Sequence, residues 1–250
     1  MRQVTDIKEI QKMQLDILVE FDKFCRDHNL KYFLAYGTLL GAVRHKGFIP
    51  WDNDVDVCML RDEYEKLIKL YKDNRYRLMS VERCKRNEYT YAHAKMVDSK
   101  TLLIEKFQHD KEWGVYIDIF PLDYLFNGEK DYNLILKRYN RINYLETAVG
   151  IKGIVLKIIG RKQLSRIYKF IHKYNKNKSK YVGNCCAANN QEDYYNIDWF
   201  NDTTEIVFEK QLFKAPLEYK KILERKYGNY MKLPPIEEQK PQHDFNAYIK

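Results

Sequence analysis

Residues 54–59 alternate acidic and apolar side chains, in the order Asp54-Val55-Asp56-Val57-Cys58-Met59. Successive side chains of a β-strand point to opposite faces. The alternation therefore predicts a strand in which Asp54 and Asp56 share one face, while the two valines face the core. Burying a carboxylate without a partner costs several kcal/mol. A fold built around this strand must supply a positive charge to its acidic face.

A third acid, Asp118, has a similar setting between Ile117 and Ile119, in a predicted strand over 114–120 that Pro121 should end. Three such acids on neighbouring strands would form a site for a hard divalent cation, most simply Mg²⁺, with Mn²⁺ as an alternative. Asp118 could instead face water at a sheet edge. A calcium loop starting at Asp52 is disfavoured, because its sixth position is Val57, where such a loop needs glycine.

Phosphate-binding candidates lie upstream of these acids. A glycine at a strand-to-helix turn lets a phosphate approach the backbone, and the helix N-terminus offers free N–H groups. Gly37 and Thr38 fit this pattern, with Thr38 as the expected N-cap of a short helix ending at His45. The other substrate-binding candidates are Arg44, Lys46, Asp52 and Lys95. Solvated helix ends are the alternative for Arg44 and Lys46, and an ion pair with Asp98 is the alternative for Lys95.

The positive charge of the chain is concentrated in one segment. The net charge is +9, yet residues 147–191 contain ten Lys and Arg residues and no Asp or Glu. We expect residues 148–180 to include a basic amphipathic helix within a single catalytic domain spanning residues 1–250. This helix could lie on an anionic membrane, bind a polyphosphate glycan, or pack its apolar stripe on the core.

The sequence predicts a reduced, cytoplasmic protein, with peripheral association to the inner face of the cell membrane as an alternative. The first residues are polar, and no apolar run is long enough for a membrane span. Five cysteines at irregular spacing are typical of a reducing compartment. Half of a zinc site at Cys185-Cys186 is the alternative, although no matching ligand pair accompanies it.

Mixed helix and strand patterns, with helices in excess, predict an α+β fold. Helices are expected over 6–28 and 131–147, from Asp62 with a capping box to Glu65, and from Pro216 to a stop at Gly228. Strands are expected over 31–36 and 91–97. Residues 175–196 are predicted to be irregular, and an extended tail should follow Pro234-Pro235.

Taken together, these motifs resemble the LicD family, which is related to fukutin-type transferases. The similarity covers most of the chain and is weakest over 148–205. The matching stretches are residues 37–52, 54–56, 117–123 and 226–235. The family usually has Asp where this chain has Asn53, which supplies no charge but should point away from the metal-binding face.

The resemblance implies a nucleotidyltransferase-like fold, in which a mixed sheet is flanked by helices. It implies that Asp54, Asp56 and Asp118 are the catalytic, metal-binding acids, preceded by the Gly37-Thr38 turn. The implied reaction moves phosphocholine, or a similar phospho-alcohol, from a CDP-linked donor such as CDP-choline. The implied acceptor is a hydroxyl of a cell-surface glycan, of the teichoic acid or lipopolysaccharide type and in some cases lipid-linked.

The expected mechanism is an in-line attack of the acceptor hydroxyl on the choline-bearing phosphorus, with CMP as the leaving group. The metal would bridge the diphosphate, and Asp118 would help to deprotonate the hydroxyl. Two alternatives remain: nucleotidyl transfer from an NTP by the same acids, and non-catalytic binding of a polyanion. Nucleic acid is disfavoured as a partner, because the lysines lack interleaved glycine-aromatic motifs. The sequence specifies neither the donor alcohol nor the oligomeric state.

Overall fold

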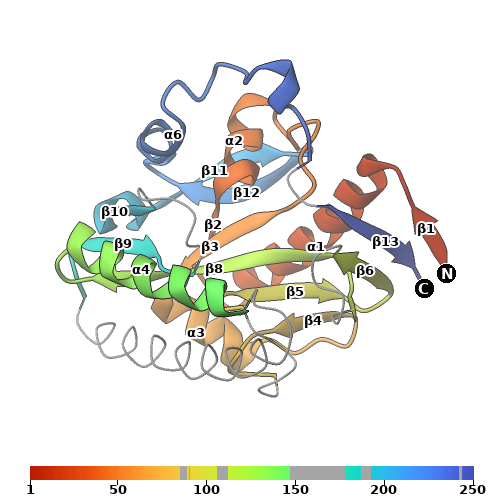
Figure 1. The fold of residues 1–250 in the computed structure, drawn as a ribbon, viewed down its shortest axis with the longest axis horizontal. Coiled ribbons are helices and arrows are strands. Elements are labelled where there is room, and N and C mark those ends of the chain that lie inside the picture. Colours follow the sequence, from red (N-terminus) through yellow and green to blue (C-terminus); the bar gives the residue numbers. More distant parts are fainter. Residues whose placement is uncertain (85–88, 90, 106–111, 147–177, 187–192, 242–243) are drawn as a thin grey trace.

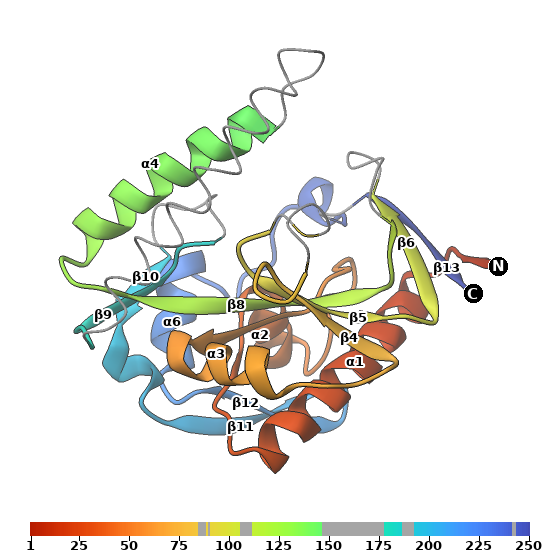
Figure 2. The same ribbon diagram turned by 90° about the horizontal axis from the view of Figure 1, so that it is seen from below.

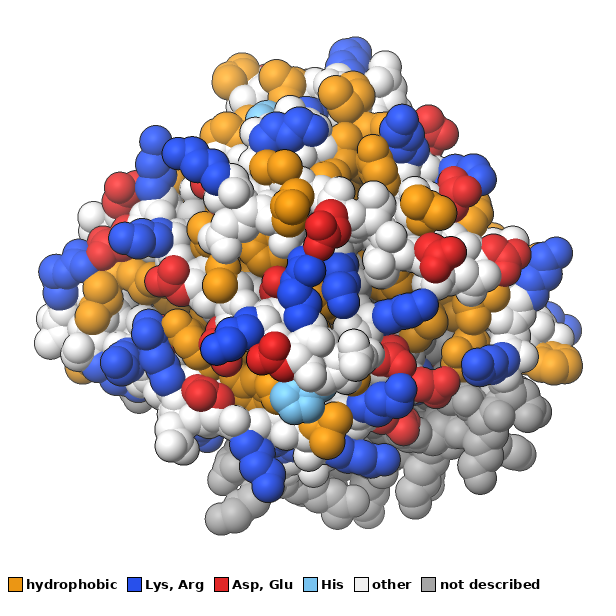
Figure 3. All heavy atoms as spheres, turned by 180° about the vertical axis from the view of Figure 1, so that it is seen from behind, with side chains coloured by type: hydrophobic (Ala, Val, Ile, Leu, Met, Phe, Trp, Pro, Cys, Tyr) orange, Lys and Arg blue, Asp and Glu red, His pale blue; other side chains and the backbone are white. Residues whose placement is uncertain are grey.

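The computed structural model describes residues 1–84, 89, 91–105, 112–146, 178–186, 193–241 and 244–250. Within these residues the protein has the expected α+β architecture, a mixed sheet flanked by helices (Figure 1). Most of the basic segment 148–180 lies outside the described residues, so its helix stays a prediction. On the face shown in Figure 3, Lys and Arg side chains of the described residues are interspersed with Asp and Glu.

Five α-helices occur in the described part of the chain. They are α1 (Ile7–Asp27), α2 (Tyr36–Arg44), α3 (Arg61–Leu70), α4 (Glu129–Glu146) and α6 (Tyr219–Tyr227). Two short 3₁₀ helices cover Ile197–Phe200 and Ile236–Glu238. The periodicity over 6–28 correctly predicted α1, whose N-cap Asp6 accepts a hydrogen bond from the backbone N–H of Lys8. The predicted stop is also confirmed, since Gly228 ends α6 with a φ of +62°.

The main sheet is organised around its longest strand, β8 (Tyr116–Leu125). On one side β8 runs parallel to β3 (Asp56–Leu60), which pairs in turn with β2 (Phe33–Leu34). On the other side it pairs antiparallel with β5 (Ala94–Asp98) through its first half and with β9 (Tyr181–Asn184) through its second half. The outer strands are β4 (Tyr76–Met79), next to β5, and β10 (Tyr194–Asn196), next to β9.

Pro121 does not end β8, contrary to the expectation from sequence. The β5 pairing ends at Ile119 and the β9 pairing begins at Leu122, so Pro121 falls in the gap between these two partners. On the opposite side it sits in register with Met59 of β3. A proline lacks the N–H that a central strand needs, and the change of partner at this point removes that need.

Two further β-structures were missed in the sequence. One sheet joins both ends of the chain, so the expected extended tail ends in a strand (Figure 1). It contains β1 (Arg2–Val4), β13 (Phe245–Ile249), β6 (Thr101–Glu105) and β7 (Glu112–Trp113). A hairpin forms from β11 (Thr203–Phe208) and β12 (Gln211–Pro216). Its turn residues Glu209 and Lys210 both have positive φ, which suits the right-handed twist of a tight hairpin. Pro216 therefore ends a strand rather than starting the last helix.

Three other expectations about local structure were wrong. Helix α2 begins at Tyr36 with Ala35 as N-cap, so Thr38 lies inside the helix. Helix α3 begins after Leu60 without a side-chain cap, so the capping box does not form. Strands β9 and β10 occupy part of the region 175–196 that was predicted to be irregular. They pair with each other, and β9 also pairs with the distant strand β8, a partner that local propensity does not reveal.

The faces of the main sheet differ in what covers them, as Figure 2 shows. On one face, Val57 and Ile119 pack in a core with residues of α1 and α3. On the other face, Cys58 and Phe120 pack with Tyr132 of α4. The valines therefore face the core as predicted. By strand alternation, Asp56 and Asp118 lie on the same face as Cys58 and Phe120.

Candidate active site

Three charged residues form a row across neighbouring strands of the main sheet. Asp56 of β3 is in register with Asp118 of β8, and Asp118 is in register with Lys95 of β5. Adjacent strands lie about 4.8 Å apart, so these side chains are immediate neighbours. All three residues are less than 9% exposed. The sequence identified each member of this row separately, and the sheet brings them together.

Lys95 and His93 both contact the same oxygen of Asp118. Lys95 Nζ lies 2.6 Å from Asp118 Oδ1, and His93 Nε2 lies 3.0 Å from that atom. The Lys95 ammonium also lies 3.5 Å from the ring centroid of Tyr116. His93 was not among the predicted site residues, although its position two residues before Lys95 in an extended segment was a signal for it. The alternative pairing of Lys95 with Asp98 does not form, because Asp98 pairs with Arg75.

These contacts keep Asp118 ionised. Burial acts to raise the pKa of Asp118, but the nearby charge of Lys95 and the contacts with His93 outweigh it and lower that pKa. Burial and the charge of Lys95 lower the pKa of His93, against the opposing effect of Asp118. The imidazole is therefore neutral near pH 7, and its Nε2–H donates to Asp118.

The acids on the other side of the row repel one another. Burial, and then the charges of Asp54, Asp118 and Asp52, raise the pKa of Asp56 well above its usual range. Burial, the charge of Asp54 and a hydrogen bond with the Asp54 side chain raise the pKa of Asp52 to about 8. The carboxyl groups of Asp52, Asp54, Asp56 and Asp118 thus act on one another electrostatically. Lys95 supplies a positive charge to one of them, Asp118.

This donor set fits a hard divalent cation, because such an ion prefers carboxylate oxygens and would relieve their repulsion. Asp56 and Asp118 are side by side in register on neighbouring strands, and Asp54 lies just before β3. Within the described residues, however, no three acidic, imidazole or thiol groups already converge as ligands of one ion. The contacts of Lys95 and His93 engage Asp118 Oδ1, so Oδ2 is the oxygen better placed to accept a cation.

The Gly37-Thr38 pair is coupled directly to the acids. Thr38 Oγ1 accepts a hydrogen bond of 2.9 Å from the backbone N–H of Asp56, which fixes the start of β3. A Cβ atom at Gly37 would lie 2.5 Å from Asp52 Oδ2. In this structure the group that approaches Gly37 is thus the Asp52 carboxylate. The first-turn N–H groups of α2, which include that of Gly37, have no acceptor within the helix.

Arg44 is the last residue of α2, about 10 Å from Gly37 along the helix axis, and Lys46 follows it just beyond the end of the helix. Arg44 Nη1 donates to the backbone carbonyl of Tyr230 at 3.1 Å. Lys46 is exposed and accepts a backbone hydrogen bond from Glu209. The structure therefore does not bring these two residues into the row of charged side chains, and their role toward the substrate stays a prediction.

Asn53 lies beside the acids in the chain, and its backbone N–H donates a hydrogen bond of 3.1 Å to Asp52 Oδ1. Asn53 is buried, and its backbone carbonyl accepts a hydrogen bond from Gln14 of α1. Cys185 and Cys186 are buried free thiols, and burial raises the pKa of both. Because a high thiol pKa disfavours the thiolate form that binds zinc, these surroundings do not favour a zinc site.

Comparisons with known proteins show what the whole chain is similar to. A family model described as LicD/FKTN/FKRP, nucleotidyltransferase domain, matches residues 29–150, which contain the entire row. Lipopolysaccharide cholinephosphotransferase LicD of Haemophilus influenzae is 32% identical, over 97% of this chain and 98% of that protein. An uncharacterised protein of Rickettsia typhi is 30% identical over 41% of this chain and 31% of its own length. Among the described helices, none has the length and apolar character needed to cross a membrane.

Proposed function

The chain belongs to the LicD family and is a phosphotransferase of the LicD type, and we propose that it transfers phosphocholine from CDP-choline to a hydroxyl of a cell-surface glycan. The observation that carries the proposal is the row Asp56–Asp118–Lys95, within a chain that is similar over nearly its whole length to a cholinephosphotransferase. We take a lipopolysaccharide-type acceptor first, because that relative is named for it, with teichoic acid as the alternative.

In this proposal Asp54, Asp56 and Asp118 hold Mg²⁺, which would supply positive charge to the diphosphate of the donor. Lys95, fixed by Asp118 and the ring of Tyr116, adds a positive charge on the side of β5. The free N–H groups at the start of α2 face developing negative charge on phosphate oxygens. Each of these groups is held in place before substrate arrives, which is what electrostatic catalysis requires.

The transfer forms one bond and breaks one bond. The oxygen of the acceptor hydroxyl forms a bond to the choline-bearing phosphorus, and the bond from that phosphorus to the bridging oxygen breaks. CMP leaves with the electron pair of that bond. The hydroxyl proton passes to a carboxylate, for which we retain Asp118.

The direct test is incubation of the purified protein and Mg²⁺ with a lipopolysaccharide acceptor and, separately, CDP-choline, CDP-ribitol or CDP-glycerol. Phosphorus NMR should show CMP formation, with CDP-choline as the preferred donor. Asp56→Asn and Asp118→Asn should each reduce turnover by at least about 100-fold. Asp62→Asn is the matched control, because Asp62 is an exposed acid at the start of α3.

The same experiment separates this proposal from nucleotidyl transfer, which the same acids can support. Pyrophosphate released from an NTP, with all three CDP-alcohols left intact, would reject phosphocholine transfer. Near-normal turnover by Asp56→Asn would reject the assignment of the site even if CDP-choline is consumed.

A further inference from the structure

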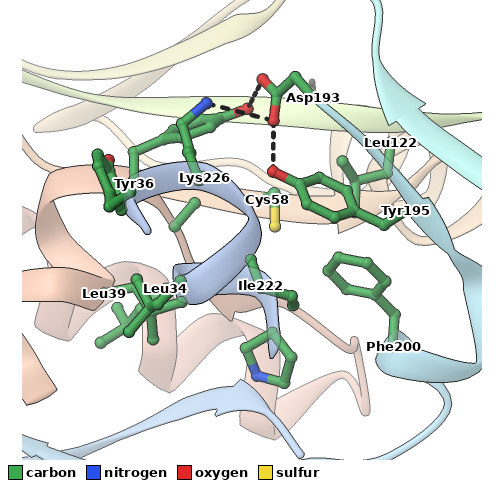
Figure 4. A pocket seen from close by; sticks show the side chains of 14 residues that line it. Leu34, Tyr36, Leu39, Cys58, Leu122, Asp193, Tyr195, Phe200, Ile222 and Lys226 are labelled. Carbon is green, nitrogen blue, oxygen red and sulfur yellow. Dashed lines mark hydrogen bonds and ion pairs between the residues drawn. The ribbon is translucent and has the colours of Figure 1, made fainter. Parts of the chain in front are cut away.

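A small cavity lies beside the row of acids, on the same face of the main sheet. Figure 4 shows side chains that line it, and the lining residues come from β2, α2, β3, β8, β12, α6 and the segment around β10. Aromatic and aliphatic side chains form most of the lining, and one carboxylate, Asp193, lies at its polar end. The aromatic members are Tyr36, Tyr195, Phe200 and Tyr227. We call this space the Asp193 pocket.

The Asp193 pocket lies next to the proposed catalytic site along β3 and the start of α2. Cys58 lines it and follows Asp56 by two residues on the same face of β3, about 6.6 Å along the strand. Tyr36 lines it and directly precedes Gly37. The charges of both Asp56 and Asp193 add to burial in raising the pKa of Tyr227, so its hydroxyl lies within electrostatic range of both acids. A short substrate tail could therefore extend from the acids into the pocket.

Asp193 is a buried acid in a network of hydroxyl groups. It is 2% exposed, and its oxygens accept hydrogen bonds of 2.7 Å from both Tyr36 Oη and Tyr195 Oη. Asn184 Nδ2 donates to Tyr36 Oη at 2.6 Å, which holds the ring from a second side. The backbone of Tyr36 has a φ of +47°, which is unusual for an aromatic residue. The network thus fixes the position of the Tyr36 ring.

The pocket already accommodates a cation. The ammonium of Lys226 lies 4.4 Å from the ring centroid of Tyr36 and 3.5 Å from Asp193 Oδ1. The latter distance is long for an ion pair, whereas the tyrosine hydroxyls contact Asp193 closely. Lys226 comes from the last turn of α6, on a long side chain with several rotatable bonds. A face of an aromatic ring next to a carboxylate is the environment that binds quaternary ammonium groups.

We propose that the Asp193 pocket binds the trimethylammonium group of the donor, with Asp193 as counter-charge and the rings of Tyr36, Tyr195 and Tyr227 as walls. The Lys226 ammonium occupies this place in the free protein and withdraws when the substrate enters. This inference rests on the proposed function. It names the residues that would make the protein select a donor carrying choline over donors carrying other alcohols. Apolar neighbours such as Phe200 and Ile222 suit methyl groups, which accept no hydrogen bonds.

The test compares two donors that differ in a single atom. CDP-choline and its neutral carbon isostere, CDP-3,3-dimethylbutanol, share every other group, so the ratio of their dissociation constants isolates the pocket. Isothermal titration calorimetry with Mg²⁺ and no acceptor measures both without turnover. The wild-type protein should favour CDP-choline by at least about tenfold. Asp193→Asn should reduce that ratio to nearly one, with little change in binding of the neutral donor.

Lys226→Met gives the opposite prediction. Removal of the resident cation leaves Asp193 uncompensated, so CDP-choline should bind several-fold more tightly and the ratio should rise. A fall in affinity for both donors would overturn the proposal, because it would mean that Lys226 binds a phosphate. Lys221→Met is the matched control, since Lys221 is an exposed lysine of α6 that pairs with Glu218 and does not line the pocket.

A third variant keeps the test decisive if Asp193→Asn does not fold. Tyr195→Leu removes one wall without placing a new polar group in the pocket, and it should also lower the ratio. Wild-type discrimination below twofold, or an unchanged ratio in folded Asp193→Asn and Tyr195→Leu, overturns the inference. If wild-type protein turns over CDP-choline in that case, the proposed function still stands. If it neither binds nor turns over CDP-choline but uses CDP-ribitol, both proposals for choline fail.

Discussion

The ammonium nitrogen of Lys95 lies 2.6 Å from Oδ1 of Asp118, in the interior of the main sheet. Lys95 thereby supplies a counter-charge to Asp118, which lies in register with Asp56 on the neighbouring strand. It explains why the pKa of Asp118 is lowered although its burial acts in the opposite direction, while the pKa of neighbouring Asp56 is raised. The five predictions below concern this charge distribution and the contacts that support the sheet around it.

Lys95→Met should destabilise the protein by about 3 kcal/mol or more at pH 7, because it leaves Asp118 buried without its charge partner. In the variant, burial would raise the pKa of Asp118, so stability should fall as pH rises above about 4. Urea denaturation at pH 4.5 and pH 7 measures this, with the exposed Lys100→Met as control. An equal loss for both lysines would contradict the assigned pairing.

Asp52 makes the metal-free protein less stable at high pH. Its folded-state pKa of about 8 lies above the value of an unfolded carboxyl group, so the folded state holds a proton that the unfolded state has released. The stability that this proton provides is complete below about pH 4 and is lost as pH rises through 8. Thermal melts should show Asp52→Asn to be stabilising at pH 8.5 relative to wild type, and less so at pH 5.

Thermal melts also test whether the protein binds Mg²⁺. Added Mg²⁺ should raise the melting temperature of the wild-type protein at pH 8.5, since an ion bound only to the folded state stabilises it. The rise should be smaller in Asp56→Asn. A pH-independent melting temperature together with no response to Mg²⁺ would contradict both the carboxylate repulsion and the cation site.

Thr38→Val should remove the acceptor of the Asp56 backbone N–H while keeping the shape of the side chain. A buried N–H without an acceptor costs about 1–3 kcal/mol, and turnover should fall because Asp56 loses its anchor. Thr38→Ser retains the hydroxyl and should recover most of both losses. Urea denaturation and CMP release are the two readouts. Equal behaviour of the serine and valine variants would show that the hydroxyl is not the cause.

The buried pair of Arg61 and Asp123 supports the sheet from the end of β3. Arg61 Nε lies 2.6 Å from Asp123 Oδ1, Nη2 lies 2.8 Å from Oδ2, and both residues are 1% exposed. Asp123→Asn should cost about 3–5 kcal/mol, because it leaves the guanidinium buried without its counter-charge. The double variant Arg61→Met with Asp123→Leu should recover much of that loss in urea denaturation. A loss below about 1 kcal/mol for the single variant would contradict this role.

Several parts of the fold were predictable from local patterns. Helix α1 follows from its apolar periodicity and its cap, and the burial of Val55 and Val57 follows from alternation along the strand. Strands whose partners are distant were harder to predict. Strand β13 forms because β1 and β6 flank it, and β8 continues through Pro121 because its partner changes there. Such pairings depend on three-dimensional neighbours, about which a local window carries no information.

The sequence by itself determined which residue types carry the chemistry, because alternation in a strand and a carboxylate among apolar neighbours have few stable outcomes. It identified Asp56, Asp118 and Lys95 individually. Only the tertiary structure decided that they form one row, since strand register sets which side chains become neighbours. It also joined Asp193 and Lys226 to Tyr36, across 157 residues in the case of Asp193 and Tyr36. Contacts between such distant segments arise from packing, which no local pattern encodes.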